Sequence, residues 1–418
     1  MSSPPAELVE RLRARGQEHV LLGWTEFGAD AREELVRQID AVDWSALAAH
    51  THDEVGALPP NFEPVPITPA AFTDAEKERG ADALRNGKVA ALLVAGGQGS
   101  RLGSLQPKGL FPAAPLSGAP LYQLHAEKVF ALSRRYGRAV PFLVMTSPAT
   151  DAQTRAYFAE QPHLMYAPDQ VRFFRQGTMP AVCAHSGRLL LEAPGRLFLS
   201  PNGHGGTLTA LADSGLLGEL AERGVEHVFY FQVDNPLIKM CDPGFIGRHI
   251  AANAEVSSKV IAKDRPDEKV GVLVSANGRC SIIEYTLLPK ELAEARDASG
   301  LLRYRAGSPA IHLFSVAFLQ RVTRTAAGSL PYHTARKAVA HHDPQTGQAV
   351  PAPKEPNAVK FERFIFDALP HAERWLAQAG VNTNGHPVEI SPLFALDADE
   401  LAAKVSRLPT LTGPTDLN

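Results

Sequence analysis

The chain has 418 residues, which suggests about two or three domains and leaves ample chain for a substantial core. It carries 42 Lys and Arg residues against 45 Asp and Glu residues, a net charge of −3, which argues against a general electrostatic attraction to nucleic acid or an anionic membrane. Hydrophobic residues at 44% and charged residues at 21% are typical of globular proteins and argue against wholesale disorder.

The N-terminal part predicts a small helical region. Apolar residues keep helical spacing within residues 6–50, and Asp30 with Glu33 forms a capping-box pattern before the second helical run. Residues 58–69, LPPNFEPVPITP, are too rich in proline to continue a helix and predict an ordered linker or an extended strap. We therefore place the first boundary at residue 70.

The central part, residues 71–350, predicts an α/β domain. Thr73 and Glu76 form a capping box, and the helix they start is expected to end near Asn86, before the apolar run 89–95. Further apolar or β-branched runs alternate with helix-like stretches, which predicts a mostly parallel, Rossmann-like sheet. These runs are residues 140–146, 171–174, 228–233 and 256–262.

Two features set off the later part of the chain. Strand-like runs on either side of Asn277 and Gly278 predict an antiparallel hairpin insertion, because both residues tolerate positive φ. A Gly- and Pro-rich stretch over 343–356 precedes an amphipathic segment over 359–377. We take residues 351–418 as a small C-terminal appendix that carries Lys360.

The cysteines and apolar runs indicate the compartment. Cys183, Cys241 and Cys280 are far apart and form no CxxC pair, which argues against a disulfide framework and a structural zinc site. The first thirty residues lack the apolar core of a signal peptide, and the longest apolar run is far below the roughly 18 residues that cross a bilayer. We expect a cytoplasmic protein without nucleic-acid or membrane partners.

The most informative stretch is the glycine loop that follows the apolar run 89–95. Glycines let backbone N–H groups approach an anion closely, and Arg101 and Lys108 supply positive charge for phosphate. The loop therefore predicts a polyphosphate ligand, with a tight glycine turn carrying surface charges as the structural alternative. Its glycines are Gly96, Gly97 and Gly99.

Two familiar phosphate loops do not fit this stretch. A P-loop needs Lys after a glycine and then Ser or Thr, whereas Lys108 lies between Pro107 and Gly109. The dinucleotide fingerprint needs a third glycine where Leu102 stands, and no acidic residue follows about 20 positions later. An NAD(P)-dependent oxidoreductase is therefore a weak alternative.

Six motifs along the chain belong together. They are LLVAGGQGSRLGSLQPKGLF at 92–111, FFRQGTMPA at 173–181, FYFQVDNPLIKMCDPGFIG at 229–247, IIEY at 282–285, RAG at 305–307 and VKFERFIFD at 359–367. In this order they resemble the UDP-sugar pyrophosphorylases, in particular the UDP-N-acetylhexosamine pyrophosphorylases. The resemblance covers most of the chain and implies a GT-A-like nucleotidyltransferase fold. It also implies a Mg²⁺-dependent uridylyltransferase that joins UTP and a sugar 1-phosphate and releases pyrophosphate.

The resemblance assigns roles to the charged residues. It implies that Arg101 and Lys108 stabilise the pyrophosphate and that Lys360 bridges the sugar phosphate and the α-phosphate. Asp234 follows a predicted strand, where a carboxylate can hold Mg²⁺, and it is the implied metal ligand. The ordinary alternatives are a turn cap formed by Asp234 with Asn235 and a solvated helical lysine at position 360.

The resemblance also assigns roles to neutral and acidic residues. Gln176 and Gly177 match the position that binds uracil, which an amide can pair with, and Gly205 belongs to a second glycine turn in the nucleotide site. Glu284 matches an acceptor for a sugar hydroxyl. A buried glutamine and an exposed strand carboxylate are the alternatives for Gln176 and Glu284.

Two loops depart from the N-acetylhexosamine pattern. His204 stands where that pattern has Asn, which is more like the UDP-glucose pyrophosphorylases, and Ser308 lies in a loop that lacks the expected asparagines. UDP-N-acetylglucosamine and UDP-glucose therefore both stay open as products. A catalytically silent nucleotide-binding regulator is the alternative from another class, and a monomer is mildly preferred.

Overall fold

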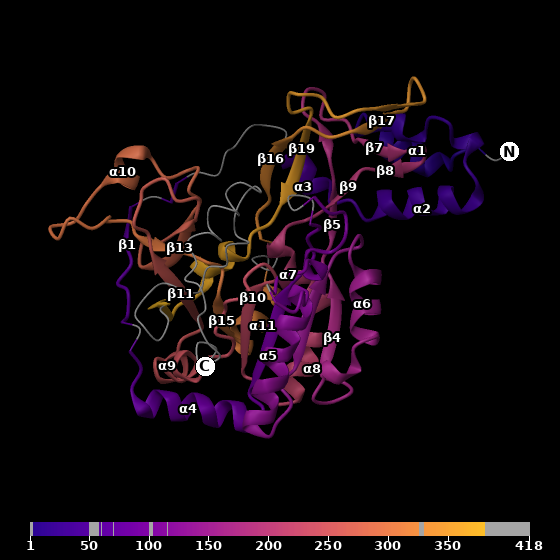
Figure 1. Ribbon diagram of the computed structural model, residues 1–418. Coiled ribbons are helices and arrows are strands. Elements are labelled where there is room, and N and C mark those ends of the chain that lie inside the picture. The colour runs from indigo at the N-terminus through magenta and orange to yellow at the C-terminus, as the bar shows by residue number, and fades with distance from the viewer. Residues whose placement is uncertain are drawn as a thin grey trace. The chain divides into compact units, whose positions relative to one another are not determined.

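The computed structural model describes residues 3–49, 58–59, 61–69, 71–99, 103–114, 116–325 and 330–380 (Figure 1). These residues form two compact units, and each unit combines three separated segments of the chain. Unit 1 consists of the described residues within Met1–Ala57, Gln176–Gly206 and Leu330–Asp367. Unit 2 consists of those within Leu58–Arg175, Thr207–Ser329 and Ala368–Asn418. The three-part division at residues 70 and 350 stays a prediction.

Unit 2 is built on an 11-stranded sheet in which four consecutive strands at one end of the strand order are parallel. The parallel strands are β10(His227–Gln232), β2(Val89–Val94), β3(Phe142–Thr146) and β4(Val171–Arg175), in that spatial order. Beyond β10 the sheet continues with antiparallel neighbours in the order β15(His312–Ser315), β11(Val256–Ala262), β14(Ala306–Gly307), β12(Val272–Ala276) and β1(Phe62–Pro64). The expected α/β class with a mainly parallel central sheet is confirmed.

Two strands pair with the sheet beside this path. β20(Trp375–Ala379) runs parallel to β11, and β13(Arg279–Ile283) runs antiparallel to β12. Asn277 and Gly278 form the turn between β12 and β13 with φ of 51° and 76°, the left-handed region that these two residue types tolerate.

Helices cover the sheet of unit 2, and the first of them, α4, has the side-chain cap that the sequence predicts. Thr73 and Glu76 make the predicted capping box at the start of α4(Asp74–Arg85), and Asn86 is its C-cap. A membrane-spanning helix is not found in the described part of the chain. The other helices of unit 2 are η4(Lys108–Leu110), α5(Leu121–Tyr136), α6(Asp151–Ala159), η5(Pro162–Leu164), α7(Thr207–Asp213), α8(Leu216–Glu222), α9(Pro243–Ala251), α10(Lys290–Glu294) and α11(Val316–Arg324).

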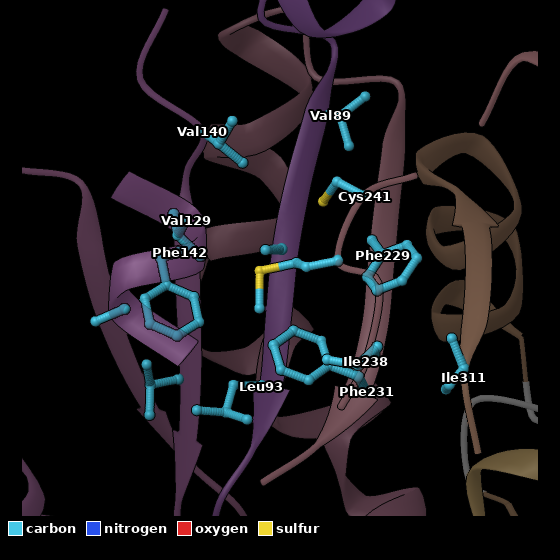
Figure 2. Close-up of a cluster of buried hydrophobic side chains, with 14 of the residues drawn as sticks. Val89, Leu93, Val129, Val140, Phe142, Phe229, Phe231, Ile238, Cys241 and Ile311 are labelled. Atoms are coloured by element: carbon cyan, nitrogen blue, oxygen red, sulfur yellow. The ribbon is translucent and has the colours of Figure 1, made fainter. Parts of the chain in front are cut away.

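The central strands supply the core of unit 2. Leu93, Phe142, Phe229 and Phe231 are buried and project from neighbouring strands into one apolar cluster (Figure 2). A strand buried on both faces needs an almost continuous apolar sequence, which is what the run 89–95 provides. The packing of this core therefore fixes the positions of the strand ends, and the polar residues that follow each strand lie there.

Helices α4 and α9 pack so closely that their backbones approach each other without side chains between them (Figure 1). A Cβ on Gly247 would lie 1.6 Å from the carbonyl oxygen of Glu76, and a Cβ on Gly80 would lie 1.9 Å from that of Pro243. Arg248 also donates from Nε to the Glu76 carboxylate over 2.8 Å. This pair lowers the pKa of Glu76 to about 2, because the guanidinium hydrogen bond favours the ionised carboxylate.

Unit 1 combines N-terminal helices with small antiparallel sheets. Its helices are α1(Ala6–Arg13), η1(Glu18–Leu21), η2(Trp24–Glu26), α2(Ala29–Asp40) and α3(Trp44–Ala49), while η6(His204–Gly206) and the start of η8(Ile365–His371) come from later segments. Helix α2 begins after Gly28 with no side-chain cap, so the capping box predicted at Asp30 is wrong. Asp30 lies inside the first turn, where its charge favours the helix dipole instead.

Three sheets complete unit 1. The first has the order β16(His333–Lys337), β19(Ala358–Glu362) and β6(Val182–Cys183). The second has the order β18(Gln348–Val350), β17(His341–Asp343), β7(Leu191–Ala193) and β8(Arg196–Leu197), and the third pairs β5(Thr178–Pro180) with β9(Leu199–Pro201). Lys360 lies on β19, so the helical alternative for it is wrong. Its register partner across the antiparallel pair with β16 is Ala335.

Candidate functional site

The candidate site in unit 2 lies at the carboxyl ends of two neighbouring parallel strands. β2 and β10 pair in register up to Val94 and Gln232. The glycine loop follows β2 and Asp234 follows β10, so both leave the sheet at the same edge. Ligands of open α/β sheets bind at this edge, because loops and polar side chains gather there.

Backbone hydrogen bonds within the glycine loop hold its shape. Lys108 donates its N–H to the carbonyl of Gly97 over 3.0 Å, and Gly99 donates to the carbonyl of Gln106 over 2.9 Å. A Cβ at Gly97 would find no atom within 4 Å, so the chain at Gly97, next to Gly96, borders open space where a ligand fits. Arg101 lies outside the described residues, as do Ser100 and Leu102.

Lys108 and Asp234 form the central contact of this site. Lys108 Nζ donates to Oδ2 of Asp234 over 2.8 Å, although the two residues are 126 positions apart. The side chains are 25% and 13% exposed, so the pair lies at the surface of the core rather than inside it. A cation and a carboxylate are thus held side by side next to a loop suited to phosphate.

The second carboxylate oxygen of Asp234 fits a metal ion. Oδ1 is buried and has no hydrogen-bond partner among the described residues, which is costly for an ionised group. A cluster of three or more His, Cys, Asp or Glu that could hold a metal is not found in the described part of the chain. Mg²⁺ does not need such a cluster, since it commonly takes one or two carboxylates together with substrate phosphates and water.

Two residues that we did not single out from the sequence hold the Asp234 turn. His125 and Lys128 lie three residues apart on α5, so they share one helix face. His125 Nε2 donates to the carbonyl of Val233 over 2.9 Å, and Lys128 Nζ donates to the carbonyls of Pro236 and Ile238. Burial lowers the pKa of His125 to about 3, so the ring is neutral. Only the helical spacing of the two residues could have suggested this contact.

Glu284 and Ser308 are brought together elsewhere in unit 2. Ser308 donates its N–H to the carbonyl of Gly271 over 2.9 Å, and a Cβ at Gly271 would lie 3.5 Å from Oε1 of Glu284. Both side chains are half-buried. Glu284 follows β13 and Ser308 follows β14, and both of these strands pair with β12.

In unit 1, the segment with Gln176 and Gly177 meets the glycine turn of Gly205 at Asn202. Asn202 donates its N–H to the carbonyl of Gly177 over 3.0 Å, next to the buried Gln176. Gly205 donates to the carbonyl of Arg363 over 2.7 Å, and a Cβ there would lie 2.5 Å from the Phe364 nitrogen. Close backbone packing is therefore sufficient reason for a glycine at 205.

His204 lies among aromatic rings of unit 1. Its Nδ1 accepts a hydrogen bond from the N–H of Ile365 over 3.2 Å, and its ring centroid lies 5.3 Å from that of Phe364. Burial, with a smaller contribution from His333, lowers the pKa of His204 to about 4, so the ring is neutral near pH 7. A neutral imidazole can still exchange hydrogen bonds with a ligand.

Lys360 is half-buried on β19, and no ion pair of its ammonium is found among the described residues. Its Nζ lies 5.1 Å from the ring centroid of Phe198, which attracts the ammonium weakly. Burial lowers the pKa of Lys360, and Lys337 adds to the effect while Glu362 opposes it. An anionic ligand beside the ammonium would offset the free-energy cost of burying its charge.

The sequence matches a known protein family and is similar to named relatives. The family model described as UTP–glucose-1-phosphate uridylyltransferase matches residues 38–356. The UDP-N-acetylglucosamine diphosphorylase 1 of Arabidopsis thaliana is 34% identical over 396 residues, which cover 89% of this chain and 76% of that protein. The UDP-N-acetylglucosamine pyrophosphorylase of Saccharomyces cerevisiae is 34% identical over 376 residues, 85% of this chain and 79% of that protein.

A solved structure shows the same fold. The UDP-N-acetylglucosamine pyrophosphorylase of Trypanosoma brucei, crystallised with an inhibitor, superposes with a TM-score of 0.75 at 26% identity. The match covers 96% of this chain and 85% of that one.

Proposed function

This chain belongs to the UTP–glucose-1-phosphate uridylyltransferase family, and from that premise we propose that it is a Mg²⁺-dependent enzyme joining UTP to a sugar 1-phosphate. The products are a UDP-sugar and pyrophosphate. The observation that carries the proposal is the contact of Lys108 with Asp234 beside the open glycine loop.

The chemistry is an in-line displacement. An oxygen of the sugar 1-phosphate attacks the α-phosphorus of UTP, the bond to the bridging oxygen breaks, and pyrophosphate leaves with the electron pair. Such a transfer depends on positioning and on neutralising charge rather than on a covalent intermediate with the protein. Backbone N–H groups of the loop around Gly97 hold phosphate oxygens, and Lys108 stabilises the leaving pyrophosphate. We assign Arg101 to the same task.

Asp234 is the metal ligand in this proposal. Its Oδ1, which has no hydrogen-bond partner among the described residues, supports the assignment, and Lys108 on Oδ2 keeps the carboxylate oriented. A bound Mg²⁺ supplies additional charge neutralisation for the phosphates. His125 and Lys128 fix the turn that presents Asp234, so we assign them a positioning role.

The remaining candidate residues are assigned by their chemistry. Gln176 and Gly177 form hydrogen bonds with the edge of uracil. The half-buried ammonium of Lys360 binds the reacting phosphates. Gly205 belongs to the nucleotide site, where it also allows the close backbone contact with Phe364. We assign His204, Glu284 and Ser308 to the sugar, whose hydroxyls an imidazole, a carboxylate and a hydroxyl can bind.

Two sugars compete in this proposal. The named relatives act, by their names, on UDP-N-acetylglucosamine, which favours N-acetylglucosamine 1-phosphate. His204 stands where the N-acetylhexosamine pattern has Asn, and the loop of Ser308 lacks the asparagines of that pattern, which favours glucose 1-phosphate. We take N-acetylglucosamine 1-phosphate as the first candidate. Residence in the cytoplasm and a monomeric state complete the proposal.

The test measures pyrophosphate release from UTP and Mg²⁺ with a panel of sugar 1-phosphates. The panel contains the 1-phosphates of glucose, galactose, N-acetylglucosamine and N-acetylgalactosamine. Release with the N-acetyl sugars supports the first candidate, and release with plain hexoses alone supports the second. UTP binding measured by calorimetry without any release would indicate the silent nucleotide-binding regulator instead.

A further inference from the structure

A cavity of about 920 Å³ lies in unit 1, and all of its described lining residues belong to this unit. This volume lies in the range of small-molecule sites, about 300–1,000 Å³. The end of α1, helix α3, the turn at 182–187 and strands β16 and β19 form its wall. None of the candidate nucleotide, sugar or metal residues that the structure describes lines it, so the proposed reaction does not account for it.

The charged residues of the described lining are positive. Arg15 and Arg336 both line the cavity, and the described lining residues include no Asp or Glu. Trp44, Val359 and Phe361 supply an apolar surface, and the hydroxyls of Ser45, Ser186 and Thr334 lie around it. Arginine binds phosphate and carboxylate groups through paired N–H donors, and an aromatic ring packs against apolar groups. The lining therefore suits an anion that carries an apolar or aromatic part.

One of the two arginines is held in place before any ligand arrives. The guanidinium carbon of Arg15 lies 5.1 Å from the ring centroid of Trp44, and its Nη1 donates to the carbonyl of Arg11 over 2.8 Å. A cation already stacked on an aromatic ring loses little freedom when an anion binds, which favours affinity.

The cavity lies behind the strand that carries Lys360. In the sheet register Thr334 faces Phe361 and Arg336 faces Val359, while Lys360 faces Ala335. Side chains of a strand alternate between its two faces, so the lining residues lie on one face and Lys360 on the other. A ligand in the cavity would press on the back of β19 without touching Lys360.

We propose that this cavity binds a small organic anion, a phosphate or carboxylate joined to an apolar or aromatic group. We propose further that its occupancy acts through β19 on Lys360. The second statement rests on the proposed function, whereas the first does not.

The binding test uses the full chain and phenyl phosphate as the probe. Isothermal titration calorimetry is expected to show saturable binding, with a matching change in Trp44 fluorescence that Trp44→Phe removes. Arg336→Gln, at an exposed side chain, is expected to weaken binding about ten-fold, because one charged partner of the anion is lost. Arg196→Gln, which removes an exposed arginine outside the cavity, is the matched control and should leave the affinity unchanged. Benzyl alcohol, a neutral probe, should bind the unmodified chain more weakly than phenyl phosphate binds Arg336→Gln.

Two binding results would overturn the site. One is no saturable binding of phenyl phosphate up to about 10 mM, a concentration that corresponds to negligible affinity. The other is equal affinity of Arg336→Gln and the unmodified chain, which would place the probe elsewhere.

The coupling test measures turnover with UTP and the best sugar 1-phosphate. Phenyl phosphate is expected to change kcat at least about two-fold at saturating substrate, and Arg336→Gln should abolish the change. An effect on KM alone would show competition at the reaction site and overturn the coupling. Binding without any turnover would contradict the proposed function and the coupling together, and would leave the binding site standing.

Discussion

Replacing Lys108 by methionine separates a catalytic role of this lysine from a structural one. Methionine keeps most of the side-chain length and removes the charge. If Lys108 stabilises the leaving pyrophosphate, kcat should fall about 100- to 1,000-fold, the range seen when one preorganised transition-state partner is removed. Each factor of ten corresponds to about 1.4 kcal/mol, so the loss is about 3–4 kcal/mol of activation free energy.

The effect on folding should be much smaller. The pair with Asp234 is partly exposed, at 25% and 13%, so its loss should cost about 1–2 kcal/mol, between values for surface and buried pairs. At about 2.1 cal/mol/K of unfolding entropy per residue, this corresponds to a drop in Tm of about 1–4 °C. Steady-state pyrophosphate release and differential scanning calorimetry measure the two quantities on one preparation.

A matched control exists in the same unit. Lys88 pairs with Glu226 over 2.8 Å, with exposures of 42% and 52%, away from the candidate residues. Lys88→Met should leave kcat unchanged and lower Tm by about 2 °C or less. A kcat of Lys108→Met within about three-fold of the unmodified chain would refute the reasoning, since removing a group that stabilises the transition state lowers kcat by more than this.

Asp234→Asn should raise the Mg²⁺ concentration for half-maximal activity about ten-fold or more, because the partnerless oxygen loses its charge; an unchanged Mg²⁺ titration would restrict Asp234 to a turn cap. Since burial lowers the pKa of Lys360, activity should fall with rising pH below the usual lysine range near 10.5, and Lys360→Arg should shift that limb upward. Stability linked to Lys360 should rise with pH across the same window, because the unfolded chain holds the proton longer; a flat unfolding free energy would contradict the shift. Gly247→Ala should destabilise by about 3 kcal/mol or more in urea denaturation, because its Cβ would lie 1.6 Å from a backbone oxygen, whereas Gly218→Ala, with open space on α8, should be neutral or stabilising. Iodoacetamide at pH 7.5 should label Cys183 and spare Cys241. Hydrogen bonds from Ser186 and the backbone lower the pKa of the Cys183 thiol against the opposing effect of burial, whereas burial raises the pKa of the Cys241 thiol. Equal labelling of the two cysteines in peptide mass spectra would exclude this difference.

Local patterns predicted the central strands and helix α4 well. The run 89–95 forms β2, the run 256–262 forms β11, and Thr73 with Glu76 caps α4 as expected. These features depend on residues close in sequence, through apolar content and capping hydrogen bonds. The placement of the glycine loop and Asp234 at strand ends followed from the same strands.

Features set by distant segments could not be predicted in the same way. Lys360 lies on a strand because β19 pairs with β16 and β6, and an apolar-polar pattern of five residues does not reveal those partners. The support of the Asp234 turn by His125 and Lys128 joins residues about 110 positions apart. The roles of the candidate residues, Arg101 included, stay predictions that the experiments above address.

The composition of unit 1 from three separated segments has a consequence during synthesis. Leu8 and Leu12 of α1 share a buried cluster with Phe361, which the ribosome adds about 350 residues later. At about 5–20 residues per second, the apolar face of α1 waits roughly 18–70 s for this partner. During that interval the nascent chain exposes apolar surface that chaperones can bind, so heterologous expression should depend on chaperone supply more than on the stability of the finished protein.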